Sequence, residues 1–146
     1  MRTDHFVEST VEQAAKEWLA EIGFHTGYAP VDAAVDDVRD SLGDCILWSH
    51  VANALTRLNP GVDPDLVRSA VARIQRAESQ DVMTENQRLY ELMVRGVPVE
   101  TTGDDGRPST VRLRLVDFDT PENNDWRVLN QFTIIEAGHN RRPDLL

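Results

Sequence analysis

The sequence predicts an α+β fold in a single domain, with helices over residues 1–96 and a β-rich part over residues 97–146. Two patterns carry this prediction. Up to residue 96, apolar residues recur every three or four positions between helix start and stop signals, whereas from Val97 onward they alternate with other residues. The chain has 146 residues, close to the usual size of one domain, so one core can bury most of the surface that the unfolded chain exposes.

The first predicted helix begins at Ser9 and ends before Gly23. Ser9 can cap the helix, and Glu12 closes a capping box three residues later. Residues 27–48 show neither a clear helical period nor a clear strand period, so we expect mostly loop with one helical turn there. The helix should bury one stripe of apolar side chains, namely Val11, Ala14, Ala15, Trp18, Leu19 and Ile22.

Three further helices are predicted before the period changes. One covers about residues 49–58 and is stopped by Asn59-Pro60-Gly61. The next has Asp63 as its cap, with proline at the first helical position, and should run to about residue 77. The last begins at Thr84, which opens another capping-box pattern, and ends at Gly96.

The β-rich part begins with a predicted hairpin. Its strands cover residues 97–101 and 111–116, and a Gly-Asp-Asp-Gly turn lies between them. Arg112 and Arg114 fall on its solvent-facing side. A further strand is expected over residues 126–136, and residues 144–146 begin what looks like another. These strands would form an incomplete mixed sheet.

Composition excludes several classes of protein. The formal net charge is −10, from 15 basic and 25 acidic residues, which opposes nonspecific binding to a polyanion. No apolar stretch approaches the roughly 20 residues needed to cross a bilayer. The N-terminus lacks an apolar export signal and Cys45 has no second cysteine to pair with, so we expect a cytoplasmic protein. Lys16 is the only lysine, which leaves little room for lysine chemistry.

The densest group of chemically active residues lies near the C-terminus. Carboxylates beside arginines and a histidine suit a divalent metal ion next to a phosphate, because oxygen ligands favour Mg²⁺ and guanidinium groups match phosphate oxygens. The alternative is a solvated turn with ordinary ion pairs. The group consists of Glu136, His139, Asn140, Arg141, Arg142 and Asp144.

Other candidates are weaker. Glu12 is most simply a capping residue, with the alternative that it faces an active site. Arg112 and Arg114 either form the outer face of a strand or follow a nucleic-acid backbone. The spacing of the histidines indicates no zinc site, and the sequence contains neither a glycine-rich phosphate loop nor a nucleophile motif.

Several longer motifs resemble the N-terminal region of the restriction (R) subunit of type I restriction–modification enzymes. The resemblance covers most of the chain, is strongest from residue 84 onward and is faint across residues 27–48. Shorter matching pieces are the first helix with Trp18-Leu19, LNPG (58–61) and VRGVPVE (94–100). The main motifs are LVDFDTPENND (115–125), VLNQFTIIE (128–136) and HNRRPD (139–144).

The resemblance implies a nuclease of the PD-(D/E)xK type, in which a mixed sheet carries an Asp and then a Glu-x-Lys around Mg²⁺. Pro143-Asp144 supplies the first half of that motif, and the chain ends two residues later. Asp144 is therefore the expected catalytic residue and metal ligand, with Glu136 and Glu12 as further metal candidates. The DNA contacts expected are Arg141, Arg142, His139, Arg112 and Arg114.

The resemblance also implies partners. In this family ATP is used by motor domains that the 146 residues do not include, and separate methylation and specificity subunits join the complex. We therefore expect the front part of an R subunit, from a truncated reading frame, a split gene or a fragment. It should not cut DNA alone, because its Asp lacks a second acid and an amine. An open sheet edge and uncovered apolar residues favour self-association.

Two other interpretations stay open. The chain can instead be a noncatalytic module that binds DNA or docks to the other subunits, using the nuclease scaffold for its surface. A small α/β protein of unrelated role is the third. A downstream reading frame that encodes a Glu-x-Lys strand and a motor would favour the nuclease over the module.

Overall fold

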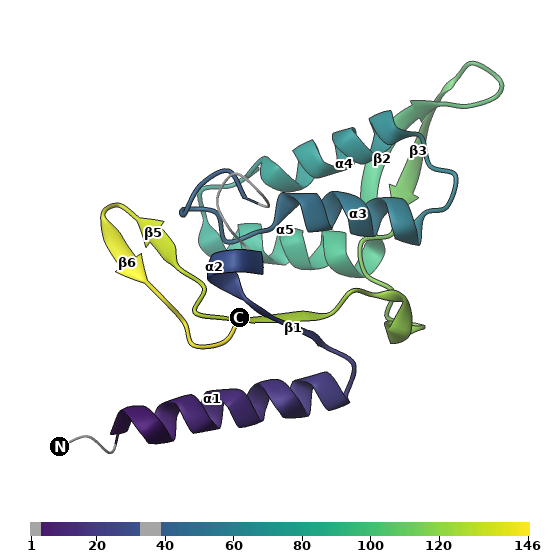
Figure 1. Cartoon of the computed structure of the whole chain (residues 1–146). Coiled ribbons are helices and arrows are strands. Elements are labelled where there is room, and N and C mark those ends of the chain that lie inside the picture. The colour runs from purple at the N-terminus through teal and green to yellow at the C-terminus, as the bar shows by residue number, and fades with distance from the viewer. Residues whose placement is uncertain (1–3, 33–38) are drawn as a thin grey trace. The chain divides into compact units, whose positions relative to one another are not determined.

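The computed structural model describes residues 4–32 and 39–146, and it confirms an α+β fold (Figure 1). The chain divides into two compact units. Unit 1 combines residues 1–47 with 125–146, and unit 2 consists of residues 48–124. That the 146 residues form one domain stays a prediction. Within the described ranges, no helix combines the length and the apolar character needed to cross a membrane.

Unit 1 is built around a short strand, β4 (Arg127–Asn130). It pairs in parallel with β1 (His25–Tyr28), in a register that sets Tyr28 opposite Asn130. Residues 144–146 lie antiparallel to β4, because the backbone N–H groups of Leu129 and Leu146 each donate to the other's carbonyl at 2.9 Å. The pairing around β4 is therefore mixed. The strand expected at residues 144–146 is reduced to an isolated antiparallel bridge between Asn130 and Leu145.

The long strand predicted over residues 126–136 is wrong. β4 ends at Asn130, Gln131 adopts the left-handed conformation with φ of 59°, and β5 (Ile134–Glu136) then pairs with β6 (His139–Arg141) as a separate hairpin. The side chain of Phe132 between them is fully buried, and the Arg39 guanidinium lies 4.4 Å from its ring centroid. A continuous apolar run thus breaks where one side chain fills the core.

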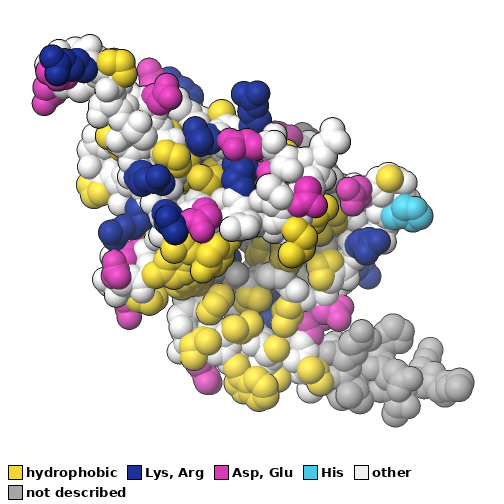
Figure 2. Space-filling view, turned by 180° about the vertical axis from the view of Figure 1, so that it is seen from behind, with side chains coloured by type: hydrophobic (Ala, Val, Ile, Leu, Met, Phe, Trp, Pro, Cys, Tyr) yellow, Lys and Arg dark blue, Asp and Glu magenta, His cyan; other side chains and the backbone are white. Residues whose placement is uncertain are grey.

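The first helix, α1 (Asp4–Glu21), begins before the predicted Ser9 cap, so Ser9 and Glu12 do not form a capping box. Both residue types are tolerated within a helix, which is why the same pattern fits an interior position. α1 contacts β1 and β4. The side chain of Trp18 is nevertheless 68 % exposed, and Val11 and Ile22 are exposed as well, so much of the predicted buried stripe faces outward (Figure 2).

Residues 27–48 contain the predicted helical turn, α2 (Ala29–Asp32), and the last residues of the unexpected β1. Residues 33–38 of this segment lie outside the described part of the chain. Ser41 and Asp44 close a turn, in which the Asp44 carboxylate accepts from the Ser41 backbone N–H at 2.9 Å. The expected loop is thus partly replaced by regular structure.

Unit 2 contains the other predicted helices. These are α3 (Trp48–Leu58), α4 (Pro64–Gln75) and α5 (Val82–Arg95), with α3 and α4 side by side (Figure 1). The Asp63 cap is confirmed, because its carboxylate accepts from the Asp65 N–H at 2.8 Å. The cap of α5 is Asp81 rather than Thr84, whose N–H donates to the Asp81 carboxylate at 2.7 Å.

The predicted hairpin is confirmed in unit 2. β2 (Val97–Thr102) pairs antiparallel with β3 (Pro108–Leu113), in a register that sets Val97 opposite Leu113. It does not belong to the sheet around β4, so the expectation of a single sheet is wrong for the hairpin. A short 3₁₀ helix, η1 (Pro121–Asn123), follows. The hairpin and helices enclose one buried cluster, consisting of Leu55, Val67, Ala70, Ile74, Leu92, Val97, Val99 and Leu113.

Candidate functional site

Glu12 projects from α1 onto the end of β4. Its carboxylate accepts a hydrogen bond from Asn130 Nδ2 at 2.6 Å and another from Gln131 Nε2 at 3.4 Å. Glu12 is half-buried, so these two amides replace water that the carboxylate would otherwise bind. The capping role predicted for Glu12 is wrong, because α1 begins at Asp4. That Glu12 faces an active site stays a prediction.

Asp144 lies on the same side of unit 1. Its backbone carbonyl accepts from the Gln131 N–H at 3.3 Å, which begins the pairing of residues 144–146 with β4. The Asp144 side chain is exposed and lines a cavity of about 380 Å³ together with Glu12. We call this the Glu12–Asp144 cavity; its other lining residues are Val11, Ala15 and Leu145.

Lys16 lies one helical turn beyond Glu12. Its Nζ donates to the Gly27 carbonyl at 3.2 Å and to Asn130 Oδ1 at 3.3 Å, so Asn130 joins the acid and the amine of α1 through its two amide atoms. Lys16 is not among the residues that line the Glu12–Asp144 cavity. Asn130 and Gln131 are not among the site residues predicted from the sequence, although two polar amides directly after an apolar strand are a usable signal.

The cavity offers oxygen ligands but not a complete cage. Carboxylate oxygens are what Mg²⁺ prefers, and one or two carboxylates with substrate oxygens commonly hold it. Glu12 and Asp144 satisfy that minimum. Across residues 4–32 and 39–146, no group of three or more His, Cys, Asp or Glu side chains is arranged to hold a metal ion. Donor chemistry therefore fits Mg²⁺ only with further oxygens supplied by a ligand or water.

The remaining residues of the predicted C-terminal group are not brought to this cavity. Glu136 is exposed on β5, opposite His139 in the β5–β6 hairpin. Arg141 ends β6, and Arg142 is exposed next to it. Only Asp144 reaches β4, because the chain turns back from the hairpin before it. The close spacing in sequence thus does not produce one cluster.

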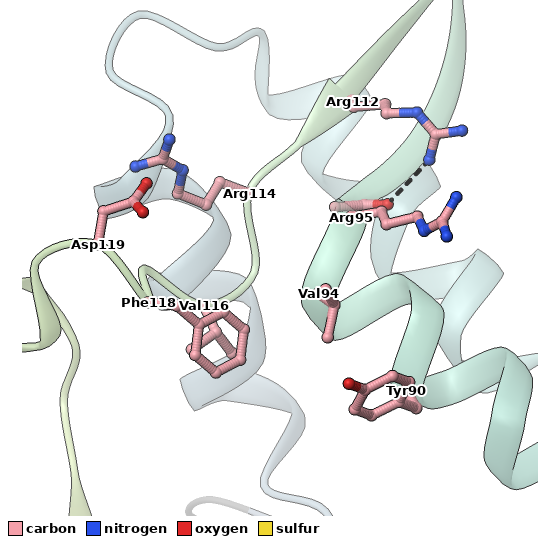
Figure 3. A pocket seen from close by; sticks show the side chains of 9 residues that line it. Tyr90, Val94, Arg95, Arg112, Arg114, Val116, Phe118 and Asp119 are labelled. Carbon is pink, nitrogen blue, oxygen red and sulfur yellow. Dashed lines mark hydrogen bonds between the residues drawn. The ribbon is translucent and has the colours of Figure 1, made fainter.

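Arg112 and Arg114 belong to unit 2, where they line a different cavity of about 610 Å³ (Figure 3). It lies between the end of α5 and the strand β3 with the loop after it. We call it the arginine–aromatic cavity. Its lining residues are Tyr90, Val94, Arg95, Gly96, Arg112, Arg114, Val116, Phe118 and Asp119.

Gly96 shapes this second cavity. It has φ of 81°, and a Cβ atom there would lie 2.9 Å from the Leu113 carbonyl oxygen, so the chain can leave α5 and enter β2 beside β3 only with glycine. Its carbonyl accepts from Arg112 Nη1 at 3.4 Å (Figure 3). Arg95 and Arg112 are therefore neighbours although they come from a helix and a strand. The sequence alone gave no reason to group them.

The Asn59 side chain holds the backbone of Arg114 in place, directly after β3. Its Oδ1 accepts from the Arg114 N–H at 2.8 Å, and its Nδ2 donates to the Arg114 carbonyl at 2.9 Å and to the Leu55 carbonyl at 2.7 Å. These bonds continue the pairing of β3 beyond its last strand residue. The helix stop predicted at Asn59-Pro60-Gly61 thus also positions Arg114.

Comparison with known families shows which family the chain belongs to. A family model described as the type I restriction enzyme R protein N terminus matches residues 5–146. The chain belongs to this family. Because the match covers nearly all 146 residues, it includes both units and both cavities, and it confirms the resemblance seen in the motifs.

Two curated members of type I restriction enzymes are similar to this chain. The first, a candidate type I restriction enzyme MjaIXP endonuclease subunit of Methanocaldococcus jannaschii, is 27 % identical over 139 residues. The second, the type I restriction enzyme HindI endonuclease subunit of Haemophilus influenzae, is 29 % identical over 143 residues. The alignments cover 93 % and 95 % of this chain but only 13 % of each relative. No solved structure matches the chain.

Proposed function

We propose that this chain serves as the N-terminal part of a type I restriction R subunit and contributes to a nuclease of the PD-(D/E)xK type. In its full-length form such a subunit would cleave unmodified foreign DNA with Mg²⁺ and ATP. The observation that carries the proposal is that Glu12 and Asp144, 132 positions apart, line one cavity at the end of a strand. The names of the relatives, which are endonuclease subunits, support it.

Asp144 and Glu12 are the proposed ligands of Mg²⁺. The bound ion would neutralise the scissile phosphate and lower the pKa of a water molecule. Asn130 and Gln131 keep the Glu12 carboxylate in place through their amide groups. They are positioning residues, because they reach the site only through Glu12. Pro143-Asp144 corresponds in this proposal to the first half of the nuclease motif.

The 146 residues are proposed to be inactive alone. In this proposal Glu12 takes the place of the second acid, because it lines the cavity together with Asp144. The amine is not supplied in the same way, because the Lys16 ammonium group is bound to Gly27 and Asn130 and does not line the cavity. ATP would act only in motor domains outside this sequence.

The proposed partners follow from the family. They are DNA and the methylation and specificity subunits of a type I complex, or the remainder of a split R subunit, in the cytoplasm. The specificity subunit would read the DNA sequence, which leaves phosphate and metal contacts to this chain. His139, Arg141 and Arg142 are the proposed backbone contacts in unit 1.

Metal titration tests the site directly. Isothermal titration with Mg²⁺, or electron spin resonance with Mn²⁺, should show weak binding that Asp144→Asn and Glu12→Gln each reduce by about tenfold. Glu136→Gln is the matched control, since it removes one exposed carboxylate from the β5–β6 hairpin. Binding that depends on Glu136 but not on Asp144 would reject the assignment.

Plasmid digestion tests the expected inactivity. Purified chain with Mg²⁺ and ATP should leave supercoiled plasmid intact over hours. Cleavage that disappears in the Asp144→Ala variant would show that the 146 residues hold a complete nuclease. Cleavage that persists in that variant would indicate a contaminating enzyme and requires a repeat with newly purified chain.

A second candidate function is a noncatalytic module that binds DNA or docks to other subunits. The arginine–aromatic cavity favours it, because this cavity contains no pair of carboxylates and yet gathers three guanidinium groups. DNA binding in the presence of EDTA, without any measurable binding of Mg²⁺ or Mn²⁺, would favour the module over the nuclease part.

A further inference from the structure

The arginine–aromatic cavity of unit 2 has two chemically different ends (Figure 3). The rings of Phe118 and Tyr90 lie toward one end. Toward the other end, the guanidinium groups of Arg95 and Arg112 lie beside the end of α5, and that of Arg114 lies on the opposite side, near Asp119. Both rings are more than half exposed, at 56 % for Phe118 and 59 % for Tyr90. The cavity therefore presents apolar ring faces and guanidinium N–H donors to the same ligand.

Phe118 is exposed on a loop that is firmly held. On one side of it, the buried Asp117 carboxylate accepts from the backbone N–H groups of Asp119 and Thr120 at 3.1 Å each. Asn124 closes the loop, because its Oδ1 accepts from the Asp117 N–H at 2.8 Å and its Nδ2 donates to the Asp117 carbonyl at 2.7 Å. The loop thus fixes an apolar ring in contact with water, an arrangement suited to stacking on a flat ligand.

The guanidinium groups retain donors for an anion. Each carries five N–H groups. Arg112 donates to the Gly96 carbonyl at a long 3.4 Å, and Arg114 Nη1 lies 3.1 Å from Asp117 Oδ2. Arg95 pairs with Glu91, outside the lining. Glu91, Asp117 and Asp119 balance the three arginines in number, so the cavity attracts an anion through its guanidinium donors rather than through an excess of positive charge. Arg112, which donates to a carbonyl rather than to a carboxylate, is the guanidinium best placed to meet the paired oxygens of a phosphate.

We propose that the arginine–aromatic cavity binds a nucleotide, with its phosphate on the arginines and its base against Phe118 and Tyr90, and that the source is an unpaired nucleotide of single-stranded DNA. A duplex keeps its bases stacked on one another, so it could use the arginines but not the rings. The volume of about 610 Å³ lies within the roughly 300–1,000 Å³ of typical ligand pockets. The proposal rests on the proposed function only in taking DNA as the ligand.

The test measures binding of labelled oligothymidylate, about 10 nucleotides long, by fluorescence anisotropy. The buffer contains EDTA and low salt, so that the result does not depend on the Glu12–Asp144 cavity. Duplex of the same length and free thymidine monophosphate serve as competitors. Phe118→Leu removes the ring and Arg112→Gln removes one charge, both at exposed positions. Arg107→Gln is the matched control, an exposed arginine at the hairpin turn.

We expect single strands to bind more tightly than duplex, with Phe118→Leu weakening this binding by about tenfold. Arg112→Gln should weaken it and reduce the slope of log K against log salt by about 0.7, the value for one phosphate contact on a single strand. Arg107→Gln should change the affinity by less than about twofold. If free thymidine monophosphate binds as tightly as the single strand, the cavity still binds a nucleotide, but its ligand is a free nucleotide rather than single-stranded DNA.

Preference for duplex, no binding of either nucleotide form, or equal losses in Arg107→Gln and Arg112→Gln would overturn the proposal. The two proposals fail separately. If the chain binds single strands in EDTA but does not bind Mg²⁺, the nucleotide proposal is supported and the metal site is rejected. If it binds Mg²⁺ but no single strands, the metal site is supported and the nucleotide proposal is rejected.

Discussion

The Glu12 carboxylate accepts a hydrogen bond from Asn130 Nδ2 at 2.6 Å across 118 positions of the chain. The same amide accepts from Lys16 Nζ, so one side chain at the end of β4 holds two charged residues of α1. Asp144 reaches this place because residues 144–146 pair with β4. The proposed metal site thus depends on a helix at one end of the chain and a strand at the other.

Replacing Asn130 with alanine should destabilise unit 1. The half-buried Glu12 would lose its strongest donor and Lys16 one acceptor, at a cost of about 1–3 kcal/mol in the free energy of unfolding. Urea denaturation followed by tryptophan fluorescence measures this loss. Asn140→Ala, on the exposed β6, should change the free energy by less than about 0.5 kcal/mol. Equal midpoints for the two variants would contradict the role of Asn130.

Asn59→Ala should loosen the connection between α3 and β3. Three hydrogen bonds of the Asn59 side chain are lost, two of them to the backbone of Arg114. We expect a loss of about 1–3 kcal/mol in the free energy of unfolding. Hydrogen exchange should show faster exchange of the Arg114 N–H in particular. Unchanged exchange at Arg114 would show that the strand extension holds without Asn59.

The stability of unit 2 should depend on pH through Asp117. The pKa of the Asp117 carboxyl group is lowered, most strongly by the hydrogen bond from the Asn123 side-chain amide. The Thr120 N–H and the charge of Arg114 lower this pKa further. Because the folded pKa lies below the unfolded one, these contacts stabilise the fold above the usual aspartate pKa of about 3.9. That stabilisation is lost as the pH falls through the folded pKa.

Asp117→Asn removes this dependence. The melting temperatures of the wild type and of Asp117→Asn should approach each other from about pH 6 down to pH 3, because the melting temperature of the wild type falls more steeply. At the higher pH the wild type should be the more stable of the two. Parallel curves over the whole range would mean that Asp117 does not contribute to the pH dependence.

The exposed apolar face of α1 should promote self-association. Trp18 is 68 % exposed, and Ile135 and Leu146 are also exposed in unit 1. Trp18→Glu should lower the weight-average mass in light scattering at high concentration. Met83→Glu is the matched control, because Met83 is an exposed apolar residue of α5 in unit 2. A wild-type chain that stays monomeric at every concentration would contradict the prediction.

Local signals predicted the elements of unit 2 well. Asp63 with Pro64, the stop at Asn59-Pro60-Gly61 and the alternation on both sides of a glycine-rich turn each depend on a few neighbouring residues. Caps, turns and period are properties of short segments, so the sequence is enough to place them. The boundary of α5 moved only from Thr84 to the cap at Asp81.

The predictions that failed required long-range information. The apolar stripe of α1 predicted the helix correctly. It did not predict how much of the stripe other elements would cover. The apolar run over residues 126–136 looked continuous, although Phe132 turns into the core and Gln131 takes a left-handed conformation. Neither outcome is set by the period of the local sequence.

The sequence by itself determined the four longer helices, the β2–β3 hairpin and the family resemblance. Only the tertiary structure decided that Glu12 joins Asp144, that Glu136 does not, and that Arg95, Tyr90 and Phe118 share a cavity with Arg112. The physical reason is that helix and strand formation depend on neighbours a few residues apart. A binding site depends instead on which distant segments pack together. Here the pairing of β4 with β1, and of β3 with β2, brings those segments together.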